Sequence, residues 1–118
     1  MIFEKSWIDT KMKYKVIIDP KAAKDMDEIF LYVSLNDSLL SANQLLNQIE
    51  KTCFKLEKFP NRGHAPKEIA DDNSKKYLEI YYKPYRIVYE IKENIIYIHA
   101  VIEGRRDIQE ILSKRLLR

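Results

Sequence analysis

The sequence predicts an α+β domain with the element order β-α-α-β-β-β-α, in which a helical hairpin packs on one face of a small, largely antiparallel sheet. Two stretches between Pro20 and Leu56 repeat apolar residues at helical spacing, and a short polar break separates them. Three strand-like runs follow at 77–82, 85–91 and 95–102. Their connections are too short for a parallel crossover, so these runs are expected to form an antiparallel meander.

Length and composition indicate one globular domain. The chain has 118 residues and a mass of 14.1 kDa, of which 46% are hydrophobic and 33% charged. No apolar run approaches the roughly 20 residues that cross a bilayer, and we expect neither a signal peptide nor a membrane partner. The lone Cys53 cannot form an internal disulfide and is typical of a reducing cytosol, so we expect a cytoplasmic protein.

The charge is unevenly distributed along the chain. Residues 1–74 hold 11 Lys/Arg against 12 Asp/Glu, a balance of −1, whereas residues 75–118 hold 10 against 6, a balance of +4. The basic excess suits an anionic partner, either nucleic acid or an acidic peptide. A solvated basic surface explains it equally well.

The first expected element is a strand over residues 12–18, where Tyr14, Val16 and Ile18 alternate. Residues 1–11 show no sustained period. We therefore interpret residues 1–11 as an N-terminal extension and residues 12–118 as a single domain.

Two helices are expected next. Asp19-Pro20 predicts a helix start, because Asp accepts hydrogen bonds from the free amides of a first turn and Pro loses none there. Ser38 offers a second N-cap, and the segment 59–63 is a strong stop signal. The polar break between the two helices is so short that they are expected to form an antiparallel hairpin. Cys53 falls in its apolar stripe and is interpreted as a small buried hydrophobe rather than a nucleophile.

Charged residues occupy the middle of two predicted strands. Side chains alternate between the faces of a strand, so Glu79 shares a face with Tyr81, and Arg86 shares one with Glu90. The opposite faces are almost wholly apolar or aromatic. We expect one side of the sheet to pack and the other to direct Arg86 and Glu79 toward solvent or a partner. The alternative is a cross-strand ion pair of Arg86 with Glu79 or Glu90.

The remaining polar signals are weak. His99 alternates with apolar residues inside a strand and is interpreted as structural, and His64 opens a polar connector. No Cys/His cluster indicates a metal site and no glycine-rich phosphate loop occurs, so we expect no cofactor and no metal. The segment 107–110 resembles a capping box and predicts a short last helix.

Four motifs, in order, resemble the RelE/ParE toxin superfamily of type II toxin–antitoxin systems. Residues 23–33 are similar to its A-x-x-D-L-x-x-I-x-x-Y-I helix, and residues 59–63 to its P-x-x-G stop. Residues 85–89 resemble its YRIIY strand, and residues 101–107 resemble V-x-H-G-R-R-D, with Glu103 where His is common. The resemblance covers nearly the whole predicted domain and implies a toxin of the kind linked to plasmid stabilisation.

The superfamily contains two activities: RelE-like members cut mRNA in the ribosomal A site, and ParE-like members poison DNA gyrase. The resemblance implies that Arg86 and Arg106 match two arginines of the nuclease site, which stabilise the charged phosphorane. Tyr77 and Glu79 stand where its lysines belong, and Leu112 lies near its tail tyrosine. The anion-binding groups are therefore present, while the proton-transfer set is incomplete.

We accordingly predict a ParE-like toxin that binds a host macromolecule, with DNA gyrase favoured, and that is neutralised by a small acidic antitoxin. The predicted target-binding residues are Arg86, Arg105, Arg106 and Tyr81. One alternative is a ribosome-dependent mRNA endoribonuclease with Arg86, Arg106 and Glu79 as catalytic residues, or with Glu68 as the base. Some superfamily ribonucleases use a Glu and a His, but the terminal His is missing here. A degenerate member that only binds a partner is the third possibility.

Overall fold

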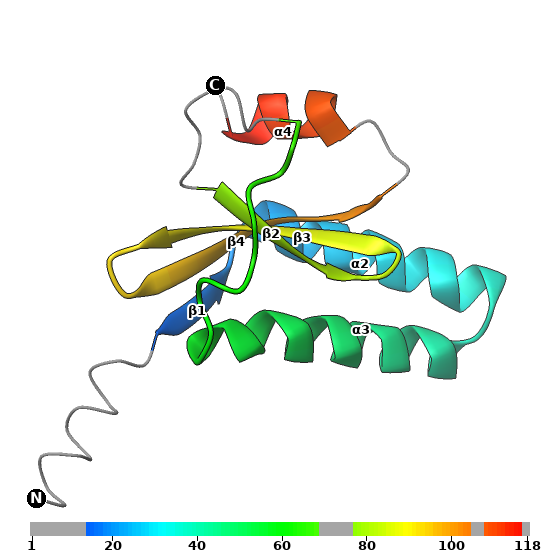
Figure 1. The fold of residues 1–118 in the computed structure, drawn as a ribbon. Helices are drawn as coiled ribbons and strands as arrows, with labels where there is room; N and C mark the ends of the chain where they lie inside the picture. The colour runs from blue at the N-terminus through cyan, green and yellow to red at the C-terminus, as the bar shows by residue number, and fades with distance from the viewer. Residues whose placement is uncertain (1–13, 69–76, 105–107, 117–118) are drawn as a thin grey trace, which may run out of the picture.

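The computed structural model describes residues 14–68, 77–104 and 108–116, so the predicted extension at residues 1–11 lies outside the described residues. A four-stranded sheet has helices on both faces (Figure 1). The elements are β1 (Lys15–Ile18), α2 (Pro20–Asn36), α3 (Leu39–Phe54), the 3-10 turn η1 (Lys55–Glu57), β2 (Tyr77–Tyr82), β3 (Tyr85–Lys92), β4 (Ile95–Glu103) and α4 (Ile108–Leu116). This order confirms the predicted α+β fold.

The sheet has the strand order β1-β4-β3-β2, with β1 parallel to β4 and the other pairs antiparallel. The turn at Lys83-Pro84 sets the register of β2 and β3, so that Tyr81 lies opposite Arg86. The register of β3 and β4 shifts between Val88 and Tyr89, which places His99 in a bulge. The tight β2–β3 hairpin thereby brings the charged residues of two strands together.

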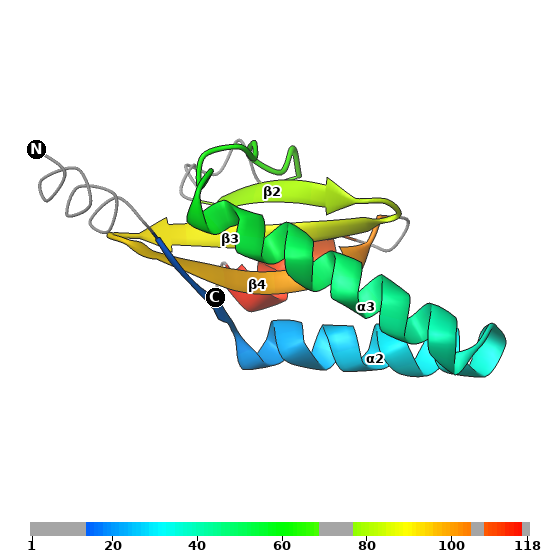
Figure 2. The same cartoon turned by 90° about the horizontal axis from the view of Figure 1, so that it is seen from below.

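The helical hairpin begins and turns where the sequence predicts. Asp19 accepts from the backbone N–H of Lys21 at 2.8 Å, and Ser38 accepts from that of Ser41 at 3.0 Å. Figure 2 shows α2 running beside β4 and α3 crossing the sheet toward β2. Cys53 is fully buried in this layer, and burial raises its pKa to about 12, so its interpretation as a core hydrophobe is confirmed. In the described part of the chain, no helix is long and apolar enough to cross a membrane.

Both faces of the sheet are buried, which corrects the prediction that one face stays open. The hairpin covers one face, while α4 covers part of the other (Figure 1), where Val88 and Ala100 pack with Ile111. Arg86 and Glu79 belong to this second face and are only 8% and 1% exposed. The alternation of faces is as predicted. The pattern of one strand does not reveal that a segment distant in sequence covers the face that carries both charged and apolar side chains.

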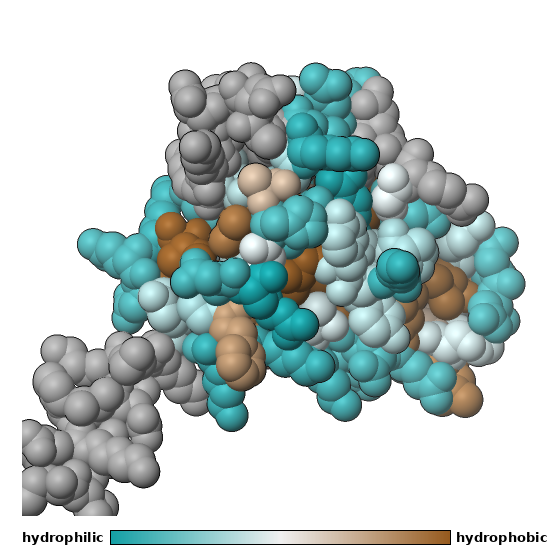
Figure 3. All heavy atoms as spheres, in the orientation of Figure 1, coloured by the Kyte–Doolittle hydropathy of each residue, from teal (hydrophilic) through white to brown (hydrophobic). Residues whose placement is uncertain are grey.

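Large apolar side chains remain exposed at the end of the hairpin where α2 joins α3. We call this group the hairpin-end patch, and its members are Leu31, Tyr32, Leu35, Leu39 and Leu40. Figure 3 shows apolar surface, in brown, at this end of the molecule. An exposed apolar group of this kind is typical of a surface that binds a partner.

Candidate functional site

A pocket at the β2 edge of the sheet gathers three of the predicted site residues. The connector that follows η1 (residues 58–68) crosses this edge from the hairpin side toward the α4 side (Figure 1). The lining residues are His64, Lys67, Glu68, Glu79, Tyr81, Arg86 and Gly104, and we call the site the Arg86 pocket. Arg86, Glu79 and Tyr81 were predicted for the site, whereas Arg105 and Arg106 lie outside the described residues.

Arg86 is the centre of this pocket, and two carboxylates hold its guanidinium. Its Nε and Nη2 each lie 2.7 Å from Oε1 of Glu79. Its Nη1 and Nη2 also donate to Oε2 and Oε1 of Glu68, at 2.6 and 2.7 Å. Because Tyr81 is directly opposite Arg86, the bond to Glu79 runs diagonally across the two strands. The ion pair with Glu79, which the sequence left as an alternative, is therefore present, and Glu68 adds a bidentate one.

The pairing shifts the acid–base properties of the pocket. Hydrogen bonds from Arg86 lower the pKa of Glu68, and hydrogen bonds to Glu68 and then Glu79 raise the pKa of Arg86. Desolvation raises the pKa of Tyr81, and so does the hydrogen bond that its hydroxyl donates to Glu79 at 2.8 Å. In formal charge, the two carboxylates of the pocket equal its two basic side chains, Arg86 and Lys67.

His64 is a site residue that sequence reasoning missed. Its backbone N–H donates to the carbonyl of Glu79 at 3.1 Å, and its carbonyl accepts from the N–H of Glu79 at 2.7 Å. The ring Nε2 lies 3.4 Å from Oε2 of Glu79 and 3.5 Å from the hydroxyl of Tyr81. The pocket therefore combines an imidazole, a carboxylate, a phenol and a guanidinium, which are groups able to exchange protons and bind an anion.

Docking of the connector depends on Gly63 and Tyr89. The hydroxyl of Tyr89 donates to the carbonyl of Pro60 at 2.7 Å and accepts from the N–H of Gly63 at 3.1 Å. A Cβ on Gly63 would stand 2.6 Å from the carbonyl oxygen of Glu79, so a glycine is required by close approach. The motif at residues 60–63 that indicates a helix stop is thus also a docking segment, but nothing in the motif itself indicates the contact of His64 with Glu79.

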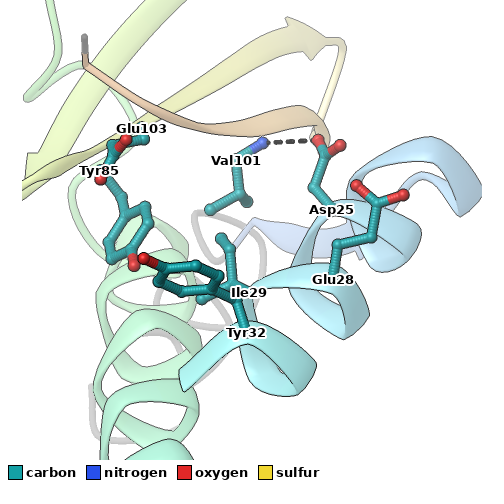
Figure 4. Close-up of a pocket in the computed structure, with 7 residues that line it drawn as sticks. All are labelled: Asp25, Glu28, Ile29, Tyr32, Tyr85, Val101 and Glu103. Atoms are coloured by element: carbon teal, nitrogen blue, oxygen red, sulfur yellow. Dashed lines mark hydrogen bonds between the residues drawn. The ribbon is translucent and has the colours of Figure 1, made fainter. Parts of the chain in front are cut away.

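A second pocket lies between α2 and β4 (Figure 4). The pairing of β1 with β4 ends at Ile18 opposite Ile98, and Asp25 accepts the backbone N–H of Val101 beyond that point, at 3.0 Å. Asp25 also accepts from Nη1 and Nη2 of Arg115, at 2.6 and 2.8 Å, which ties α4 to α2. Asp25, the carboxylate of the helix motif, therefore has a structural role: it connects α2 to β4 and to α4.

His99 lies apart from the Arg86 pocket. Its Nε2 is 2.8 Å from Oε1 of Glu90, and its ring packs edge-on against Tyr77 with centroids 5.8 Å apart. These contacts belong to the packing of the second face. Within the described ranges, no group of three or more His, Cys, Asp or Glu residues is placed to hold a metal ion.

We predict that Gly63→Ala lowers the free energy of unfolding by about 1–3 kcal/mol, the usual cost of overpacking. The added methyl group would meet the carbonyl of Glu79 at 2.6 Å and the hydroxyl of Tyr89 at 2.7 Å. Gly104→Ala is the matched control, because its methyl group would approach nothing closer than 3.3 Å. Urea denaturation followed by circular dichroism measures both variants, and equal stabilities would contradict the docked connector.

The solved structures show the same fold. A chain of the chromosomal ParDE system from P. aeruginosa is similar with a TM-score of 0.66 and 16% identity, covering 78% of this chain and 97% of that one. A chain of the toxin–antitoxin complex RelBE2 from Mycobacterium tuberculosis has a TM-score of 0.57 and 17% identity, covering 77% and 98%. A free E. coli RelE toxin carrying two arginine-to-alanine substitutions has a TM-score of 0.61 and 14% identity, covering 90% and 97%.

Sequence comparison identifies the family. Curated protein sequences gave no match. A family model described as the ParE toxin of the type II toxin–antitoxin system parDE matches residues 16–108, which is most of the chain. With the described fold, this match confirms the predicted superfamily: the chain belongs to the ParE toxin family of type II toxin–antitoxin systems, within the RelE/ParE superfamily.

Proposed function

We propose that this toxin arrests growth by binding a host macromolecule, with DNA gyrase as the favoured target. The observation that carries the proposal is the engagement of Arg86 by both Glu68 and Glu79. A ribonuclease needs a cationic group available to the phosphorane and a base available to the ribose hydroxyl. Here Arg86 and Glu79 hold each other, which favours recognition over turnover.

The charge of the pocket supports the same proposal. Proteins hold nucleic acid largely through Lys and Arg contacts to phosphates. While Glu68 and Glu79 are bonded to Arg86, they offset Arg86 and Lys67 among the described lining residues, so the pocket in this state offers no positive excess. Tyr81, which is 47% exposed, is the proposed direct contact to the target, and Arg86, which is 8% exposed, is proposed to take part through the pocket that it holds together. Arg105 and Arg106 remain predicted contacts.

A ribosome-dependent endoribonuclease is the second candidate, and the position of His64 favours it. The imidazole lies beside Glu79 and Tyr81 at the mouth of the same pocket, so it can supply the histidine that is missing from the last motif. In this reading Glu79 takes the ribose proton, His64 protonates the leaving oxygen and Arg86 stabilises the phosphorane. The reaction requires Arg86 and Glu79 to exchange their present partners for substrate.

We predict that the wild-type protein inhibits DNA supercoiling by gyrase and leaves mRNA uncut. Arg86→Ala should weaken gyrase inhibition at least about tenfold, because it releases Glu68 and leaves Glu79 without its counter-charge, which disturbs the pocket surface around Tyr81. Lys24→Ala is the control, since it removes an exposed positive charge from α2, which belongs to the hairpin on the opposite face of the sheet from Arg86. A supercoiling assay and primer extension on translated mRNA measure the two activities.

Site-specific mRNA cleavage by the wild type would contradict this prediction. The ribonuclease assignment then requires Arg86→Ala to slow cleavage about a hundred- to a thousandfold. His64→Ala should also reduce cleavage under that assignment, while circular dichroism shows a retained fold. Absence of both activities, with no growth defect, would favour a member that only binds a partner.

An acidic antitoxin is the proposed partner. The family match and the toxin–antitoxin complexes among the similar structures support this assignment. We further propose that the hairpin-end patch is one of the surfaces it covers, because leucine side chains there stay largely exposed, including Leu35 at 76%. Antitoxin segments that fold on binding bury such apolar groups.

We predict that co-expression with the neighbouring acidic open reading frame yields a stable complex, and that Leu35→Ser with Leu39→Ser weakens it at least about tenfold. Each lost leucine removes apolar burial worth about 1.5–3 kcal/mol when complete. Phe59→Ser is the control, because Phe59 is exposed to a similar degree, 60%, outside the patch. Affinity pull-down and titration calorimetry measure binding; unchanged affinity would remove the patch from the interface.

A further inference from the structure

The feature that carries a further inference is the surplus negative charge at Arg86. Glu79 alone neutralises the guanidinium, and its side chain is 2% exposed, against 10% for Arg86. Glu68 adds a second carboxylate that the charge of Arg86 alone does not require. A buried arginine needs one close counter-charge, and a second carboxylate introduces repulsion with the first.

The two carboxylates occupy different depths. Glu79 approaches Nε and Nη2 with one oxygen at the inner side, whereas Glu68 takes Nη1 and Nη2 with both oxygens at 2.6 and 2.7 Å, so the two carboxylates share Nη2. The side chain of Glu68 is 20% exposed, ten times the fraction of Glu79. The outer edge of the guanidinium is thus bound by the partner nearest to solvent. Two parallel N–H groups of an arginine are also the geometry that binds phosphate oxygens.

The surroundings of Glu68 suit an anion larger than a carboxylate. The pocket is open, with a volume of about 530 Å³, and Lys67 and His64 line it together with Arg86. Gly104 presents no side chain toward Arg86, whose Cδ would lie 3.8 Å from an added Cβ. An incoming phosphate group would therefore meet one guanidinium, one ammonium and one imidazole from the described residues.

The attachment of Glu68 is separable from that of the rest of the connector. Residues up to His64 are fixed by backbone bonds to Glu79 and by Tyr89, and Pro66 is fully buried. Glu68 lies two residues beyond this buried proline. Rotation of its side chain away from Arg86 leaves the backbone anchors in place.

We propose that Glu68 is an internal ligand of a phosphate-binding site, occupying the outer edge of Arg86 until a phosphate group displaces it. In the free protein the Nη1 and Nη2 donors of Arg86 are then occupied by Glu68. A phosphate group binds by competing with the Glu68 carboxylate for these donors. The inference rests on the geometry of the connector and holds for either target considered above.

The test uses inorganic phosphate as the probe and the full-length protein. We expect Glu68→Gln to bind phosphate about ten- to a hundredfold more tightly than the wild type, since a competing charged hydrogen-bond partner is removed. Glu50→Gln is the matched control, with the same charge change at an exposed position of α3. Titration followed by the ¹H–¹⁵N signal of the Arg86 side chain reports both affinity and location.

Two further variants keep the proposal testable. Glu68→Gln combined with Arg86→Gln should lose the gain, and Glu68→Asp should show a smaller gain if the Gln variant fails to fold. Phosphate binding by Glu68→Gln no tighter than by Glu50→Gln, with the fold intact, would overturn the proposal and leave a purely structural ion pair. Acetate binding as tight as phosphate would overturn the assignment to phosphate.

Discussion

The ion triad of Arg86, Glu79 and Glu68 is the interaction on which the site depends. Placing a guanidinium under a covered sheet face costs several kcal/mol unless a carboxylate lies close to it. Glu79 meets that requirement from the neighbouring strand, and Glu68 links the same arginine to the connector. The connector in turn places His64 against Glu79. One buried positive charge on β3 therefore joins side chains from β2 and from the connector.

Under the proposed function, this arrangement accounts for a site that contains the groups of a ribonuclease and yet acts by recognition. The groups that a ribonuclease would use are present, but they are bonded to one another. A site of this kind gains rigidity, because its buried polar groups are satisfied before any ligand arrives. No buried side-chain N or O atom within the described residues lacks a hydrogen-bond partner. A ligand that reaches the buried guanidinium of Arg86 must therefore exchange one of its present bonds.

The fold was largely predictable because its signals are local. Asp19 and Ser38 cap the helices in the expected way, and the short turn after Tyr82 leaves only an antiparallel pairing. The site was predictable only in part. Alternation placed Arg86 and Glu79 on one face, but the cover over that face comes from segments remote in sequence. The role of His64 depends on a bridge to Glu79 that no local pattern encodes.

The side-chain carboxyl titration of Glu68, followed by ¹³C NMR, tests the central claim most directly. The bond to Arg86 lowers the pKa of Glu68 in the folded state, so the triad is intact above the ordinary glutamate pKa of about 4.3 and is lost as the pH falls through the lowered value. We expect a midpoint clearly below the ordinary value in the wild type and a return toward it in Arg86→Gln. An ordinary midpoint in both proteins would contradict the account.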